Sequence, residues 1–251
     1  MTTARSTIYP AAAVEWMAGP EPRTVLDVGS GDGRLAAMMT TAGHHVTCID
    51  SDPARAARIA RRLPPGRVCI AKAESLPIRS FRYDVVTVQE SFTRFAPGLA
   101  LAEFARVLRP GGHVAVVFTS RDDTVPWVKR LARRLQEEDP TAMMGDFGRD
   151  TITALEESHH FTDIDVRTFR TWVPITRDSL LAMVRQRPAI ARLPEDRRAQ
   201  LLADVGELYD SSARTGELRL PFQAVCRRAW VDQSELTQPM DDDGLRISMR
   251  F

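Results

Sequence analysis

Residues 25–35 read Val-Leu-Asp-Val-Gly-Ser-Gly-Asp-Gly-Arg-Leu. A short apolar run leads into three alternate glycines, and a segment of helical periodicity follows them. Glycines at a strand-to-helix turn adopt positive φ and let the backbone approach a ligand, and the first amides of the helix can donate hydrogen bonds to it. The stretch therefore predicts a strand, a ligand-binding turn and a helix in immediate succession.

A second apolar run, residues 45–50, ends on Asp50, about twenty residues after the glycine loop begins. A carboxylate at this position can accept hydrogen bonds from both hydroxyls of a ribose. A glycine triplet alone is as often a structural turn as a binding site, and the acid strengthens the second interpretation. Because NAD normally requires G-x-G-x-x-G and the spacing here is G-x-G-x-G, the two features favour a nucleotide-like ligand other than NAD.

Apolar runs and helical segments alternate from residue 23 to residue 118, which is typical of βαβ units and a parallel sheet. Uninterrupted apolar runs suit parallel strands that helices cover on both faces. The expected strands span 24–28, 45–50, 67–71, 83–88 and 113–118, with later strand-like runs at 164–172 and 218–231. We expect a doubly wound, Rossmann-like α/β fold with a seven-stranded, mostly parallel sheet and helices on both faces.

Helical periodicity also marks two segments between the last two strands, residues 177–185 and 195–209. We interpret them as a helical lid inserted at about 175–215, or else as a dimer face. The sequence thus predicts one domain over residues 1–232 and a flexible tail over 233–251, in a monomer or a homodimer.

The charge balance excludes several classes of partner. With 34 basic and 33 acidic residues spread along the chain, the net charge is +1, so no nucleic acid partner is expected. Cys48, Cys69 and Cys226 lack the spacing of a zinc site, so we expect no metal. The start of the chain lacks the pattern of a signal peptide, and no apolar run is long enough to span a bilayer, which predicts a cytoplasmic protein without membrane contact.

Four ordered motifs resemble those of the class I methyltransferase family. The first is the glycine loop with its acid two positions earlier, Asp27 to Gly33. The others are Ala73-Glu74-Ser75-Leu76-Pro77, Tyr83-Asp84-Val85-Val86, and the run from Arg106 to Gly112 that precedes the fifth strand. Further features, Tyr9-Pro10 and Arg121-Asp122, resemble an actinobacterial subgroup that methylates small molecules.

The resemblance implies S-adenosylmethionine as the cofactor and S-adenosylhomocysteine as the product. Carried over by position, the glycine loop would line the methionine and ribose side, Asp50 would bind the ribose hydroxyls, and Ala73 with Glu74 would lie against the adenine. Lys72 stands where many relatives carry an acid that binds the exocyclic amine. The expected cofactor-binding residues are Asp27, Gly29, Ser30, Gly31, Gly33, Asp50, Ser51, Ala73, Glu74 and Gln89.

Residues 89–94 depart from the aromatic and histidine-rich stretch that is common in the subgroup. Because ligands bind at the carboxyl ends of parallel strands, this run should lie near the transferred methyl group. Glu90 is our candidate general base; alternatively it binds the positive end of the cofactor or pairs with Arg94. None of the five histidines is expected to lie where it could act as the general base. The candidate substrate-binding residues are Tyr9, Phe92, Arg94 and Arg121.

The sequence therefore predicts in-line methyl transfer to a small-molecule acceptor. Two alternatives stay open at this point. One is methylation of RNA or protein, which calls for a basic groove or a stacking surface. The other is a catalytically inactive regulatory protein that binds the cofactor.

Overall fold

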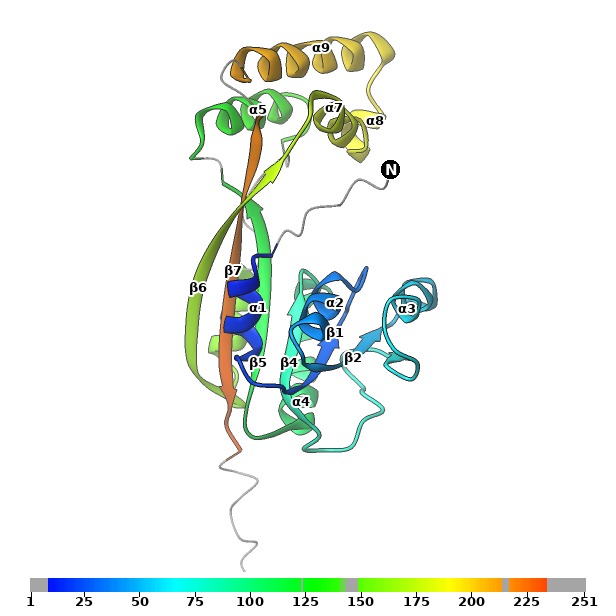
Figure 1. The fold of residues 1–251 in the computed structure, drawn as a ribbon, viewed down its shortest axis with the longest axis vertical. Coiled ribbons are helices and arrows are strands. Elements are labelled where there is room, and N and C mark those ends of the chain that lie inside the picture. The colour runs from blue at the N-terminus through cyan, green and yellow to red at the C-terminus, as the bar shows by residue number, and fades with distance from the viewer. Residues whose placement is uncertain (1–8, 123, 141, 143–148, 214–216, 234–251) are drawn as a thin grey trace, which may run out of the picture.

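The computed structural model describes residues 9–122, 124–140, 142, 149–213 and 217–233, in which seven strands form one sheet (Figure 1). The strand order is β3-β2-β1-β4-β5-β7-β6. Every pairing among β1 to β5 is parallel, and β7 runs antiparallel to both of its neighbours. The predicted doubly wound α/β fold with a mostly parallel sheet is confirmed.

The strands are β1 (Thr24–Val28), β2 (His45–Asp50), β3 (Val68–Ile70), β4 (Tyr83–Gln89), β5 (Leu108–Arg121), β6 (Phe161–Pro174) and β7 (Arg219–Val231). The helices are α1 (Ala11–Ala18), α2 (Arg34–Thr41), α3 (Pro53–Ala60), η1 (Phe92–Arg94), α4 (Pro97–Val107), α5 (Pro126–Gln136), α6 (Arg149–Glu156), α7 (Arg177–Arg185), α8 (Pro188–Ala191) and α9 (Glu195–Ser212).

Helices cover both faces of the sheet, and each face has its own core. On one face, α1, α2 and α3 pack on side chains such as Val25, Val46 and Val117. On the other face, α4 and α6 pack on side chains such as Leu26 and Val116. Because successive residues of a strand point to opposite faces, the continuous apolar runs of β1, β4 and β5 supply both cores at once.

A third core belongs to a helical layer at one end of the long strands β5, β6 and β7 (Figure 1). It consists of α5, α7, α8 and α9, which we call the helical cap. Leu131 of α5, Leu180 and Val184 of α7, and Leu201 and Val205 of α9 are fully buried there. Helices therefore occupy the segment where the sequence predicts an insertion, and α5, from an earlier segment, joins them.

Some boundaries differ from the sequence-based expectations. Helix α1 has no counterpart in them, because its eight residues are short and nearly all apolar and show little helical periodicity. Strand β5 begins at Leu108, five residues before the expected start of the strand at residue 113. The pairing of β5 with β4 is irregular here, because Tyr83 pairs with Leu108 and the next pair is Val85 with His113, so residues 109–112 have no partner on β4.

Of the predicted tail, only Gln233 lies within the described residues. No helix in the described ranges is long and apolar enough to cross a bilayer.

Asp84 ties together the starts of three neighbouring strands. Its Oδ2 accepts hydrogen bonds from the Thr24 amide at 2.8 Å and the Thr24 hydroxyl at 2.7 Å. Its Oδ1 accepts one from Arg109 Nη1 at 2.7 Å. Partial burial acts to raise the pKa of the carboxyl, but these hydrogen bonds outweigh it and lower that pKa below the ordinary value.

Asp84→Asn should lower the free energy of unfolding by about 1 kcal/mol at pH 7, because a partly exposed ion pair contributes modestly. Since the folded-state pKa is depressed, the carboxylate's contribution is complete above the ordinary carboxyl pKa and is lost as the pH falls through the lower folded value. The stability difference between wild type and variant should therefore shrink below about pH 4. Urea denaturation from pH 3 to pH 7 measures it, and a difference that does not change with pH would contradict the assignment.

Phe92 is completely buried and packs against Phe95 with ring centroids 6.1 Å apart. Phe92→Ala should lower the free energy of unfolding by about 3–5 kcal/mol, because it leaves a cavity in the core. Leu99→Ala is the matched control, since Leu99 is 62% exposed, and it should change stability by less than about 0.5 kcal/mol. Equal, small effects in urea denaturation would argue that Phe92 is not a core residue.

Candidate active site

The glycine loop joins the carboxyl end of β1 to the start of α2. Gly29 and Gly31 have φ values of 67° and 60°, in the left-handed region that other residues rarely adopt. A Cβ on Gly29 would overlap the side chain of Ser91, so packing requires this glycine. A Cβ on Gly31 would meet only a backbone oxygen at 3.9 Å. The first glycine therefore serves the fold, and the second leaves open space for a ligand.

The end of the neighbouring strand β2 holds the loop in position. The carbonyl oxygen of Ile49 accepts hydrogen bonds from the amides of Gly29 at 2.7 Å and Ser30 at 3.2 Å. The Ser30 hydroxyl donates to the backbone oxygen of Asp27 at 2.7 Å. The loop is thus fixed by the backbone before any ligand is considered.

Asp50 extends this support with its side chain. Its Oδ2 accepts a hydrogen bond from the Gly31 amide at 3.0 Å, and its Oδ1 accepts one from the Asp52 amide at 3.0 Å. The residue is 3% exposed, yet it lines a cavity beside the exposed Ser51. Each carboxylate oxygen has a second lone pair, so the carboxylate can still accept hydrogen bonds from a ligand.

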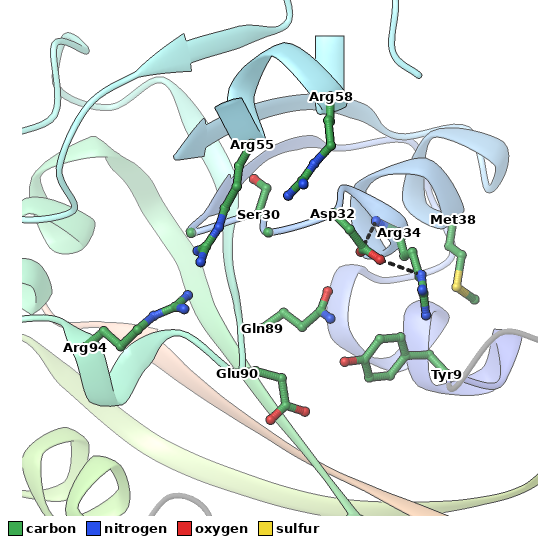
Figure 2. Close-up of a pocket in the computed structure, with 12 residues that line it drawn as sticks. Tyr9, Ser30, Asp32, Arg34, Met38, Arg55, Arg58, Gln89, Glu90 and Arg94 are labelled. Atoms are coloured by element: carbon green, nitrogen blue, oxygen red, sulfur yellow. Dashed lines mark hydrogen bonds and ion pairs between the residues drawn. The ribbon is translucent and has the colours of Figure 1, made fainter. Parts of the chain in front are cut away.

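Two adjoining cavities lie at the carboxyl ends of β1, β2 and β4, with volumes of about 330 Å³ and 530 Å³. They share Gly29, Arg55 and Arg94 in their walls, so we treat them as two parts of one crevice. Of the predicted site residues, the first cavity is lined by Tyr9, Gly29, Ser30, Gly31, Gln89, Glu90 and Arg94 (Figure 2). The second is lined by Gly29, Asp50, Ser51, Ala73, Glu74 and Arg94.

Asp27 lies beneath the loop and lines neither cavity. Its side chain is completely buried, and its Oδ1 accepts a hydrogen bond from the Thr87 hydroxyl at 2.8 Å. Burial raises the pKa of this carboxyl to about 6, against the opposing effect of that hydrogen bond. Its Oδ2 is buried without a hydrogen-bond partner among the described residues, and so is the Oε1 of Gln89. Two buried acceptors next to the first cavity therefore lack a donor.

Glu90 has an unusual backbone for its residue type, with φ of 53°. Its Oε1 accepts hydrogen bonds from the Thr119 amide at 2.5 Å and the Thr119 hydroxyl at 2.6 Å. Burial raises the pKa of the carboxyl above its usual range, in spite of these hydrogen bonds. No ion pair joins Glu90 to Arg94, although both are described, so the pairing considered from the sequence is not observed.

Tyr9 faces Glu90 across the first cavity (Figure 2). It is 3% exposed, and burial, together with the negative charge of Glu90, raises the pKa of its phenol well above the usual value. Tyr9 is therefore protonated at neutral pH and can serve as a hydrogen-bond donor.

Three other predicted site residues lie outside both cavities. Phe92 is a correction to the substrate-binding prediction, because its side chain is fully enclosed in the core and has no surface for a ligand. Gly33 packs under α3, where a Cβ would approach Ile59 Cγ2 to 3.2 Å. Arg121 lies at the end of β5 and contacts Met183 of the helical cap.

Sequence reasoning missed several residues that line the first cavity, among them Arg34, Met38, Arg55 and Arg58. Arg34 pairs with Asp32 at 2.6 Å. Arg55 and Arg58 lie three residues apart on α3 and point towards the loop (Figure 2). The sequence did contain a signal for them: two arginines three residues apart share one face of a helix, and this helix directly follows the strand that ends on Asp50.

No histidine is among the residues that line the two cavities. His113 is buried, with its Nε2 2.7 Å from the carbonyl oxygen of Met17, and it lines neither cavity. In the part of the chain that the structure describes, no group of three or more His, Cys, Asp or Glu side chains is arranged to hold a metal ion.

Comparisons with known proteins agree with this geometry. A family profile described as "Methyltransferase domain" matches residues 26–116. The chain is 30% identical over 224 residues to an uncharacterised methyltransferase of Mycobacterium tuberculosis, and the match covers 88% of each protein. It is 28% identical over 196 residues to a malonyl-[acyl-carrier protein] O-methyltransferase of Methylococcus capsulatus, with 74% of this chain and 68% of that protein covered.

A solved structure from Anaeromyxobacter dehalogenans, described as a type II methyltransferase, shares the fold. Its TM-score is 0.63 at 22% identity, and the match covers 88% of this chain and 95% of that chain. The profile and the relatives are all described as methyltransferases, and the relative from Mycobacterium tuberculosis is similar along 88% of this chain. The chain therefore belongs to the class I S-adenosylmethionine-dependent methyltransferases.

Proposed function

We propose that this chain transfers the methyl group of S-adenosylmethionine to a small-molecule acceptor that binds between the crevice and the helical cap. The observation that carries the proposal is the pair of adjoining cavities around the glycine loop. One runs past Asp50 and the other past Glu90. A ligand with a nucleoside at one end and a reactive group at the other end fits such a crevice.

The second cavity suits the nucleoside. The lone pairs of Asp50 that remain free would accept hydrogen bonds from the ribose hydroxyls, with Ser51 beside them. Ala73 would lie against the adenine. The carboxylate of Glu74 already accepts a hydrogen bond from the Ala96 amide at 2.8 Å, so its role would be to shape the wall of this cavity.

The first cavity suits the methionine part. The Oε1 of Gln89 lines this cavity and has no hydrogen-bond partner among the described residues, so it is an acceptor for which the ammonium group of the cofactor is a donor. Burying an acceptor without a donor is costly, so a ligand that supplies donors at this point gains affinity. The open space at Gly31 leaves room for the chain of that ligand.

When bound, the cofactor supplies a methyl group on a sulfonium centre, which a lone pair of the acceptor attacks in line while the carbon–sulfur bond breaks and its electrons stay on sulfur. The protein's part is alignment. Glu90, held by its two hydrogen bonds from Thr119, would take a proton from an acceptor atom that carries one. The raised pKa of its carboxyl makes it a stronger base than an ordinary glutamate.

Three observations support a small acceptor. The helical cap has its own core and lies on the extensions of β5 to β7, where it would act as a lid. The relative from Methylococcus capsulatus is named for methylation of a malonyl group on an acyl-carrier protein, so the group that is modified there is a small acyl unit, although a protein carries it. The motifs at Tyr9-Pro10 and Arg121-Asp122 resemble the small-molecule subgroup.

Asp50→Ala should weaken the binding of S-adenosylmethionine and S-adenosylhomocysteine by at least about tenfold, because hydrogen bonds to a charged acceptor are lost. Isothermal titration calorimetry measures this, with NAD as the competing ligand. Asp84→Asn is the control, since Asp84 lies at the opposite ends of the strands and should bind both ligands as the wild type does. Absent binding of either ligand, or a preference for NAD, would overturn the proposed function.

Glu90→Gln should lower kcat by about 10²–10⁴-fold with an acceptor that must lose a proton. Because Glu90 acts in its ionised form and its pKa is raised, the wild-type rate should rise with pH through a pKa above that of an ordinary glutamate. The variant should lose this rise and keep its affinity for S-adenosylhomocysteine. A small decrease that is the same at every pH would instead assign Glu90 to binding the positive end of the cofactor.

A further inference from the structure

Arg121 lies on the same face of the sheet as the catalytic candidate. Thr119, which hydrogen-bonds to Glu90, and Arg121 are two residues apart on β5, so their side chains point to the same side of the sheet. The distance between them along the strand is about 7 Å. A small molecule with its reactive atom beside Glu90 can therefore reach Arg121 with another of its groups.

The guanidinium of Arg121 has no acidic partner among the described residues. Its Nη2 lies 2.9 Å from the Sδ of Met183, and a thioether is a weak acceptor. Its central carbon lies 5.8 Å from the centroid of the Phe222 ring, and its Nε is buried without a hydrogen bond.

Neighbouring arginines of the same region do have acidic partners. Arg170 of β6 pairs with Asp122 at 3.1 Å, and Arg187 pairs with Asp139 at 2.6 Å. Arg121 thus differs from these two neighbours in having no acidic partner among the described residues.

The surroundings of Arg121 are unfavourable for an isolated positive charge. Burial lowers the pKa of its guanidinium, and the positive charge of Arg187 lowers it further. A buried charge without a counter-ion destabilises a protein unless something supplies the opposite charge. An anion that binds here would gain both the charge pair and the free donors of the guanidinium fork.

We infer that Arg121 binds an oxyanion of the acceptor, a carboxylate or a phosphate group, so the acceptor is an anionic small molecule. The inference rests on the proposed function, because it takes the methyl donor to lie in the crevice beside Glu90. It narrows the acceptor from any small molecule to those that carry such an anionic group in addition to the methylated atom.

The charges around the crevice support an anionic acceptor. Arg58 and Arg94 line the first cavity, and neither forms an ion pair with a described residue. Figure 2 shows the Arg94 side chain extending into the crevice and the Arg58 side chain ending beside Ser30 of the glycine loop. An opening lined by unpaired arginines attracts anions and raises their rate of association.

The test compares Arg121→Met with the wild type. Methionine keeps most of the side-chain length and removes the charge. Arg219→Met is the matched control, because Arg219 is an exposed arginine on the adjacent strand β7. Calorimetry with S-adenosylhomocysteine comes first, since it tests the cofactor site alone. Methyl transfer from labelled S-adenosylmethionine is then measured with pairs of compounds: carboxylic acids with their primary amides, and phosphate monoesters with the parent alcohols.

We expect all three proteins to bind S-adenosylhomocysteine with affinities within about threefold of one another. In the wild type and in Arg219→Met, one anionic class should exceed its neutral partners by at least about tenfold in kcat/KM. Arg121→Met should lose this preference, mainly because its KM for the anionic compounds rises towards its KM for the neutral ones. Which class is preferred distinguishes carboxylate from phosphate.

A second measurement does not depend on turnover. With S-adenosylhomocysteine bound, succinate or inorganic phosphate should raise the Tm of the wild type but not that of Arg121→Met. Without the anion, the Tm of Arg121→Met should equal or exceed that of the wild type, because an unpaired buried charge has been removed.

Four outcomes would overturn the inference. The first is that the wild type methylates acids and amides at equal rates, and phosphates and alcohols at equal rates. The second is that Arg121→Met keeps a preference for anions, and the third is that this variant has a lower Tm than the wild type in the absence of the anion. The fourth is a tenfold loss of affinity for S-adenosylhomocysteine in Arg121→Met. The last would assign Arg121 to the carboxylate of the cofactor. If the wild type itself fails to bind S-adenosylhomocysteine, the proposed function fails, and that result is distinct from the other four.

Discussion

The arrangement of the site depends on the hydrogen bonds between the end of β2 and the glycine loop. The carbonyl of Ile49 accepts from the amides of Gly29 and Ser30, and the carboxylate of Asp50 accepts from the amide of Gly31. Through these contacts, the loop is pinned at the edge of the sheet, with Gly31 facing open space. The same carboxylate both supports the loop and lines the second cavity, so one residue shapes the loop and the wall of the cavity beside it.

Among the described residues, six buried side-chain atoms have no hydrogen-bond partner; three belong to Asp27, Gln89 and Arg121, and three to Arg23, Arg227 and Arg228. Asp27 and Gln89 each keep an unpartnered acceptor, and Arg121 keeps an unpartnered donor. Such groups cost stability, and proteins retain few of them. Their signs are informative: the acceptors lie on the side where a cationic ammonium is expected, and the donor lies on the side of the helical cap.

The long strands connect this chemistry to the helical cap. β5, β6 and β7 continue beyond the helices that cover the sheet and pair along their length, with Arg121 opposite Phe222 (Figure 1). Because paired strands are stiff across their hydrogen bonds, the cap is carried on an extension of the sheet itself. The end of β5 thus brings Thr119 to Glu90 and Arg121 to Met183 of α7.

The sequence by itself determined the fold class, the glycine loop and the acid at Asp50, because strand periodicity, glycine conformation and the strand-end position are local properties of residues near one another in the chain. It did not determine the partners of Glu90, since Thr119 lies 29 residues away and only the pairing of β4 with β5 brings the two together. Phe92 was misjudged for a related reason: an aromatic residue after a strand can face a ligand or the core, and only packing decides which. The isolation of Arg121 is likewise a tertiary fact, because a missing counter-charge is visible only when every neighbour of the guanidinium is known.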